Sequence, residues 1–220
     1  MVAFGPCTAG ASMTRVVSVE DLRRGYGLIP QTWTERERLV FFSDRADGAT
    51  PGDTMFVEIV DAILAPVDRT DGRAVLAALL AAVQGWVTFT PDRRGADTWQ
   101  SPRVTFLRRK GDCEDMAMLL ASLVRVARVR LGLALAARLV WLRQPGRDLD
   151  HVSAQVAADD AIDETPVVIS SDATGEGMGR WQWAETTVEA ELGEDPYRAL
   201  QRVRGARVED VLGRVLAGDS

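Results

Sequence analysis

Residues 111–129 constrain the fold of this chain more than any other segment. They begin with the polar run Gly111-Asp112-Cys113-Glu114-Asp115 and continue as a stretch rich in Ala, Leu and Val. Apolar residues then follow Cys113 at the spacing of one helix face: Ala117, Leu120 and Val124. Asp is a preferred N-cap residue, so the pattern predicts a helix from Cys113 to about Val129. The thiol would begin its buried face.

The composition is that of one ordinary globular domain. The chain has 220 residues, 46% of them hydrophobic, which is enough for a buried core. A net charge of −6 offers no basic surface, so we expect no nucleic-acid partner. No segment has the length of a membrane span or the pattern of a signal peptide, and we expect a cytoplasmic protein without a membrane partner.

The two cysteines, Cys7 and Cys113, are far apart and form no disulfide-rich pattern. This spacing favours a compartment in which Cys113 stays a free thiol. Met13 is an alternative start, which would leave Cys7 outside the protein.

Helices and strands are expected to follow one another in an α+β arrangement. Asp53 is placed to cap a helix that ends before Pro66, and a second helix is expected from about Arg73 to Gln84, ended by Gly85. The segments that read as strands, separated by Gly, Pro and Asp loops, are 86–90, 138–142, 151–157 and 166–170. Helix followed by strands predicts a helix packed on an antiparallel sheet.

We divide the chain into three segments within one compact domain. Residues 1–71 are an N-terminal flanking segment with a helix, and the structure of residues 14–50 is ambiguous. Residues 72–185 form the core, and residues 186–220 form a C-terminal helical extension.

The beginning of the predicted helix suits a reactive cysteine. Its unpaired N–H groups and positive dipole end stabilise a thiolate and an oxyanion. His151, the only histidine, begins a predicted strand 38 positions after Cys113 and is the natural base. Asp172, after the next strand, best fits the group that orients this imidazole. Its competitors are Asp148, Asp150, Asp159 and Asp160.

The acids beside the cysteine oppose this role. Glu114 and Asp115 should raise the pKa of the thiol, so activation needs a cation, for which protonated His151 is a candidate. A structural interpretation also stays open. Cys113 can be a small core residue, the acids can serve as helix caps, and Trp99 can be a packed aromatic.

The combined motifs resemble the transglutaminase-like superfamily, and are most similar to bacterial transglutaminase-like cysteine peptidases and related prophage-borne proteins. The resemblance covers about residues 72–175. Its motifs are Asp97-Thr98-Trp99-Gln100-Ser101-Pro102, the Gly-Asp-Cys-Glu-Asp run, and His and Asp on successive strands. It implies a papain-like core with Cys113 as nucleophile, His151 as general base and acid, and Asp172 as the orienting residue.

The same resemblance implies further site residues. Trp99 or Gln100 would border the substrate cleft or the oxyanion hole. Some relatives use calcium, for which the matching oxygen donors are Asp97, Asp112, Glu114 and Asp115; no other cofactor is expected. The chain departs from the family after Trp181-Gln182-Trp183, where two extra helices are predicted.

We therefore expect acyl transfer through a thioester on Cys113. A protein or peptide amide would be the substrate. Water as acceptor makes the protein a peptidase or amidase, and an amine makes it a transglutaminase. Hydrolysis is favoured because hydrolytic members are well represented among the bacterial relatives. The alternative is a non-catalytic binding or assembly module that retains the fold. The oligomeric state stays open.

Overall fold

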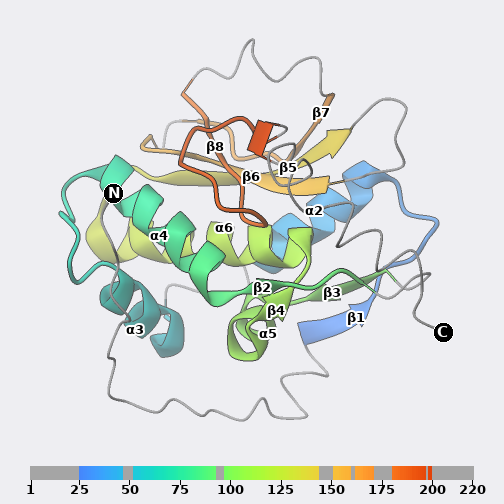
Figure 1. The fold of residues 1–220 in the computed structure, drawn as a ribbon, viewed down its shortest axis with the longest axis horizontal. Helices are drawn as coiled ribbons and strands as arrows, with labels where there is room; N and C mark the ends of the chain where they lie inside the picture. Colours follow the sequence, from blue (N-terminus) through green and yellow to red (C-terminus); the bar gives the residue numbers. More distant parts are fainter. Residues whose placement is uncertain are drawn as a thin grey trace.

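The computed structural model describes residues 25–46, 52–92, 97–143, 151–159, 162–170, 180–196 and 198–199. These residues form a sheet with helices packed beneath it, together with two short strand pairs (Figure 1). The helices are α2 (Glu35–Ala46), α3 (Thr54–Ile63), α4 (Gly72–Trp86), α5 (Pro102–Arg108) and α6 (Cys113–Leu131). The strands are β1 (Tyr26–Leu28), β2 (Thr88–Phe89), β3 (Thr98–Gln100), β4 (Lys110–Gly111), β5 (Ala136–Arg143), β6 (His151–Ala157), β7 (Val167–Ser170) and β8 (Gln182–Ala184). The α+β class is confirmed.

The main sheet has the strand order β7-β5-β6-β8. The antiparallel prediction holds for β5, β6 and β8, with Leu142 opposite His151 and Ala154 opposite Ala184. It is wrong for β7, which lies parallel to β5. Both edges of β6 are occupied by β5 and β8, so the strand that follows β6 in sequence pairs at the far edge of β5 instead.

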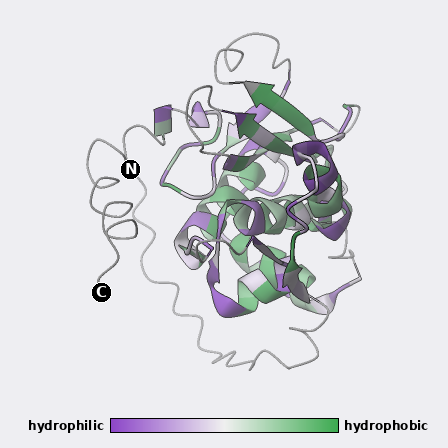
Figure 2. Cartoon of the chain, turned by 90° about the vertical axis from the view of Figure 1, so that its right-hand side faces the viewer, coloured by the Kyte–Doolittle hydropathy of each residue, from purple (hydrophilic) through white to green (hydrophobic). Residues whose placement is uncertain are grey.

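Helix α6 lies at the centre of the molecule. Residues 114–127 are all buried, and the helix packs against α2, α3, α4, β5 and β6. Figure 2 shows the hydrophobic segments gathered in this interior. A helix enclosed on all sides needs apolar and small residues around its circumference, which explains its Ala- and Leu-rich sequence. The predicted helix is confirmed, with Asp112 as its N-cap.

The predicted helices before α6 are also present, with one difference. Asp53 caps α3 as expected. Helix α4, however, continues through Gly85 to Trp86, and its C-cap is the extended residue Val87. Gly85 therefore does not end the helix, because no left-handed turn follows it.

Two helices were not predicted. In α2, Leu39, Phe42 and Ala46 face the core at helical spacing within the ambiguous segment. In α5, Ser101 is the N-cap and Pro102 is the first helical residue. Ser at the N-cap followed by Pro at the first helical position is a common helix start, so α5 could have been predicted from the sequence.

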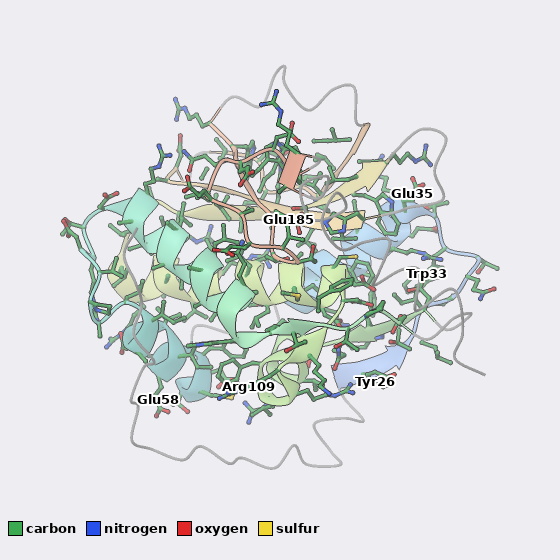
Figure 3. All side chains as sticks on the ribbon, viewed as in Figure 1. Tyr26, Trp33, Glu35, Glu58, Arg109 and Glu185 are labelled. Atoms are coloured by element: carbon green, nitrogen blue, oxygen red, sulfur yellow. The ribbon has the colours of Figure 1, made fainter. Side chains whose placement is uncertain are left out.

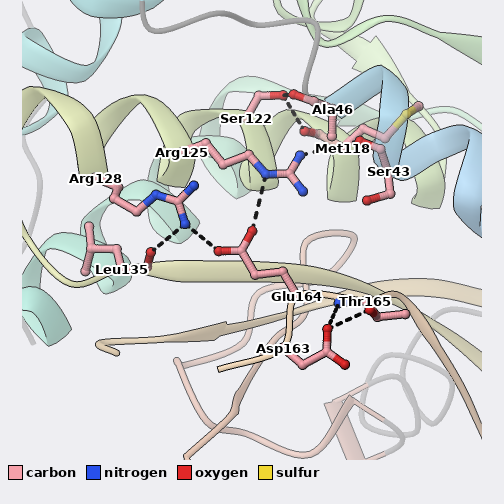
Figure 4. A network of polar contacts seen from close by, with 10 residues as sticks. All are labelled: Ser43, Ala46, Met118, Ser122, Arg125, Arg128, Leu135, Asp163, Glu164 and Thr165. Carbon is pink, nitrogen blue, oxygen red and sulfur yellow. Dashed lines mark hydrogen bonds and ion pairs between the residues drawn. The ribbon is translucent and has the colours of Figure 1, made fainter. Parts of the chain in front are cut away.

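Polar contacts join α6 to its neighbours (Figure 4). The hydroxyl of Ser122 donates to the carbonyl of Ala46 at 2.7 Å. Glu164, in the connection before β7, pairs with Arg128 at 2.5 Å and with Arg125 at 3.8 Å. These contacts connect the central helix to α2 and to the segment that leads into β7.

Among the described helices, none combines the length and the apolar character that a membrane crossing requires. The predicted helical extension covered residues 186–220; residues 186–195 form turns and irregular chain instead of a helix, and the extension lies outside the described residues from position 200 onward.

Candidate active site

Cys113 is the first residue of α6, where the sequence placed it. Asp112 and Asp115 form a capping box, in which each carboxylate accepts a hydrogen bond from the other residue's main-chain N–H at 3.4 Å. Gly111 precedes this box, and a Cβ atom there would lie 2.8 Å from Asp115 Cβ. A glycine is needed because the chain passes so close to the helix.

Asp115 is further held by Gln100 of β3. The Gln100 main-chain N–H donates to Asp115 at 2.6 Å, and its side-chain amide donates at 2.5 Å. The same amide donates to the Lys110 carbonyl, while its oxygen accepts from Arg108. Gln100 therefore braces the beginning of α6. That it borders the oxyanion hole stays a prediction.

His151 begins β6, and its Nε2 lies 2.8 Å from Oε2 of Glu185. Both side chains are buried, that of Glu185 completely. Thr187 donates to the other carboxylate oxygen through its N–H at 2.8 Å and its hydroxyl at 2.6 Å. Figure 3 labels Glu185 inside the molecule near the sheet. Glu185 thus makes the contact with His151 that sequence reasoning expected of Asp172, which lies outside the described residues.

The ionisation of Glu185 determines which nitrogen of His151 is free. Burial opposes ionisation, but the attraction of His151 and the hydrogen bonds from His151 and Thr187 hold the Glu185 pKa below its ordinary value. An ionised carboxylate only accepts, so His151 Nε2–H donates to it. Nδ1 is then the nitrogen that can act as a base.

Glu185 was missed because its position depends on strand order. The prediction assumed that the strand after β6 in sequence pairs with it, but β7 is separated from β6 by β5. Glu185 directly follows β8, the actual neighbour of β6. The only feature of the sequence that pointed to Glu185 was that an acid directly follows Trp183-Ala184. Among the competitors, Asp159 pairs with Arg180, and Asp148, Asp150 and Asp160 lie outside the described residues.

The thiol of Cys113 contacts an acid. It donates to Glu114 Oε2 at 3.2 Å, and the sulfur also accepts from the main-chain N–H of Val152, next to His151. Within the described part of the chain, no hydrogen bond joins Cys113 to His151. The sulfur therefore lies beside the first residues of strand β6 but is paired with Glu114.

The surroundings of the sulfur favour the neutral thiol. Burial, the carboxylates of Glu114 and Asp112, and the hydrogen bond to Glu114 raise the pKa of Cys113 well above its ordinary value. The Val152 N–H opposes this shift but does not reverse it. The neighbouring acids therefore raise the pKa of the thiol in the structure, as the sequence predicted.

The acids themselves form a compact group of three, Asp92, Asp112 and Glu114, whose carboxylate oxygens lie within 4.8 Å of one another. Burial and neighbouring negative charge raise the pKa of Asp112, and burial raises that of Glu114. Carboxylate oxygens are the type of ligand that calcium takes, although it takes six to eight of them, and calcium binding at this group stays a prediction.

This group differs from the predicted calcium ligands. Asp97 forms an ion pair with Arg38, and Asp115 is taken by Gln100 and the capping box. Asp92, which sequence reasoning did not select, takes part instead, and its two carboxylate oxygens also accept from the main-chain N–H and the hydroxyl of Thr98. Asp92 belongs to none of the motifs in the sequence, so nothing local pointed to it.

Trp99 is buried in an aromatic cluster. Its ring meets Phe41 edge-on at 5.1 Å, and the guanidinium of Arg45 lies 5.0 Å from the ring centroid. These contacts agree with a packed aromatic, and its place at a substrate cleft stays a prediction.

No protein-family model, curated protein or solved structure matches this chain.

Proposed function

We propose that this protein is a cysteine hydrolase of the transglutaminase-like type, with a papain-like core and Cys113, His151 and Glu185 as its catalytic group. The observation that carries the proposal is the buried His151–Glu185 pair beside the N-terminus of α6. An imidazole held by a buried carboxylate on one nitrogen, next to a cysteine at a helix start, is an arrangement suited to acyl transfer.

In the proposed reaction, His151 Nδ1 takes the thiol proton and the sulfur attacks a peptide or amide carbonyl. The N–H groups of the first turn of α6 stabilise the oxyanion. His151 then returns the proton to the leaving nitrogen, the C–N bond breaks, and a thioester remains on Cys113. Water, deprotonated by His151, hydrolyses the thioester and regenerates the thiol. Glu185 keeps the imidazole oriented throughout.

This reaction requires Cys113 to leave Glu114 and turn toward His151. The sulfur already accepts from the N–H of Val152, the residue after His151, and the proposed movement is a change of the Cys113 χ1 rotamer. We propose that Asp92, Asp112 and Glu114 hold calcium and so release the thiol. Bound calcium would neutralise the carboxylates that raise the thiol pKa. The group is thus an activation site as well as a cap.

Two other functions compete with hydrolysis. An amine acceptor would make the protein a transglutaminase, but nothing in the described site identifies an amine-binding position. A non-catalytic binding module would retain the fold while leaving the thiol paired with Glu114, as it is in this structure.

The test is labelling with a cysteine-directed epoxide between pH 6 and 9, in calcium and in chelator. Cys113→Ala should lose all labelling except any on Cys7. His151→Ala should label at least about tenfold more slowly than wild type near neutral pH. Equal rates for His151→Ala and wild type would refute the catalytic pair. Equal rates with and without chelator would refute the calcium site.

The acceptor is tested separately with casein and a fluorescent primary amine. Release of fragments that depends on Cys113 supports hydrolysis, whereas attachment of the amine to intact casein supports transfer. Absence of both, together with slow epoxide labelling in calcium, favours the binding module.

A further inference from the structure

The segment that carries Glu185 is held by one side chain of helix α4. After β8 the chain runs through residues 185–190 without helix or strand. The amide nitrogen of Gln84, in the last turn of α4, donates to three main-chain carbonyls of this segment. They are those of Glu185 at 2.7 Å, Val188 at 3.0 Å and Ala190 at 3.0 Å. Gln84 therefore joins the beginning, middle and end of the segment at one atom.

These three carbonyls depend on Gln84 for their donor. Main-chain carbonyls that are shielded from water need one. In the turns and connections of the described residues, no main-chain N–H donates to any of the three. A carbonyl only accepts, so the nitrogen and not the oxygen of the Gln84 amide faces them. A residue without a side-chain donor at position 84 would leave the segment unbraced.

The braced segment includes Thr187, which sets the direction of the Glu185 carboxylate. Pairing between β8 and β6 ends at Ala184, so the sheet fixes only where Glu185 begins. One carboxylate oxygen accepts from the N–H and the hydroxyl of Thr187, and the other contacts His151 Nε2 at 2.8 Å. Thr187 lies between the Gln84 contacts in the chain, so the brace on the segment is also a brace on the carboxylate.

We infer that Gln84 is a positioning residue for the proposed reaction: by bracing residues 185–190 it keeps the Glu185 carboxylate on His151 Nε2 and leaves Nδ1 free to take the thiol proton. Its contacts are with the main chain of the segment, so it acts through Glu185 and touches no reacting atom. The inference rests on the proposed function, because a positioned imidazole matters to catalysis only if His151 is the base.

Two substitutions at position 84 test the brace. Gln84→Met removes the donor but keeps a flexible side chain of similar size. Gln84→Glu keeps the shape, but its carboxylate would face three carbonyls, acceptor against acceptor. The matched control is Leu76→Ala, at a position 1% exposed and about 12 Å earlier on α4 at 1.5 Å per residue. It weakens the same helix by leaving a cavity and removes no donor.

Exchange of the His151 ring N–H with solvent measures the Glu185 contact directly. His151 is the only histidine, so nitrogen NMR with isotope-labelled histidine observes one imidazole. The measurement is made in chelator, so that calcium plays no part. Exchange should be about ten to a hundred times faster in Gln84→Met than in wild type, because the bonds that hold the segment are lost. It should be faster again in Gln84→Glu, and within about threefold of wild type in Leu76→Ala.

Epoxide labelling of Cys113 in calcium, near neutral pH, tests the role of Gln84 in the reaction. Gln84→Met should label about three to ten times more slowly than wild type, the effect of losing a hydrogen bond that holds the base in place. Leu76→Ala should label at the wild-type rate.

Wild-type exchange in both Gln84 variants would overturn the inference. So would equally fast exchange in Leu76→Ala, because the stability of α4 and not the donor would then be responsible. A ring N–H that exchanges in wild type as fast as in free imidazole would also overturn it, as would faster exchange in Gln84→Met without slower labelling while His151→Ala labels slowly. Failure of the proposed function has a different signature, because His151→Ala would then label as fast as wild type whatever the exchange rates.

Discussion

At the scale of single residues, the site is defined by two contacts that oppose each other. Glu185 holds His151 ready as a base, whereas Glu114 holds Cys113 as a neutral thiol. The first contact favours catalysis and the second restrains it. Each can be removed by one substitution of a carboxylate by an amide.

Glu185→Gln should reduce stability in a pH-dependent way. The folded pKa of Glu185 is lowered, so its charge stabilises the fold above the unfolded pKa of about 4.3, and this stabilisation is lost as pH falls through the folded pKa. Urea unfolding should show a deficit of about 1.5–3 kcal/mol at pH 7 that shrinks below pH 4. Glu191→Gln, an exposed control, should show no such deficit. A deficit independent of pH would contradict the ionised pair.

Glu114→Gln should make Cys113 more reactive in chelator. Removing the neighbouring charge lowers the raised thiol pKa, and each unit of decrease gives about tenfold more thiolate at a fixed lower pH. The rate of iodoacetamide labelling against pH should shift to lower pH. Glu58→Gln on the exposed face of α3 is the control. An unshifted profile would show that Glu114 does not restrain the thiol.

At the scale of elements, the beginning of α6 combines a helix cap with a brace from β3. The cap follows from local sequence, since Asp112 and Asp115 lie three residues apart. The brace does not, because Gln100 approaches from another strand. Local and distant contacts together hold Cys113 in place.

Asp115→Asn should reveal the brace. An amide nitrogen in place of one oxygen would face the Gln100 amide, donor against donor, and should destabilise the fold by about 2–3 kcal/mol in urea unfolding. Asp71→Asn, at the N-cap of α4, is the matched control. Asn caps as well as Asp, so the expected change there is within about 0.5 kcal/mol. Similar values for both would mean that Asp115 acts only as a cap.

At the scale of the whole molecule, α6 is the element on which the rest is assembled. Leu120→Ala should destabilise the protein by about 2–5 kcal/mol, because the side chain is completely buried and its loss leaves a cavity. Val129→Ala lies on the same helix but is 59% exposed, and should change stability by less than about 0.5 kcal/mol. Chemical denaturation measures both. Equal costs would contradict the central position of α6.

Much of the fold could be predicted from local sequence. The helix caps at Asp53 and Asp112 and the strand beginning at His151 depend on neighbouring residues alone. Helix α5 had an equally local start at Ser101-Pro102 that was overlooked. By contrast, the parallel position of β7 depends on which edges remain free after β5, β6 and β8 pair, which no local pattern reveals.

Local sequence was enough to predict that Cys113 begins a central helix, that acids surround it, and that His151 begins a strand, because caps and periodicity act over a few residues. The partners of these side chains depend on contacts between segments that are distant in the chain. Strand order placed Glu185 on His151, and the path of β2 brought Asp92 to Asp112 and Glu114. Contacts between distant segments depend on how elements pack, so they become readable only when the sheet and helices are assembled.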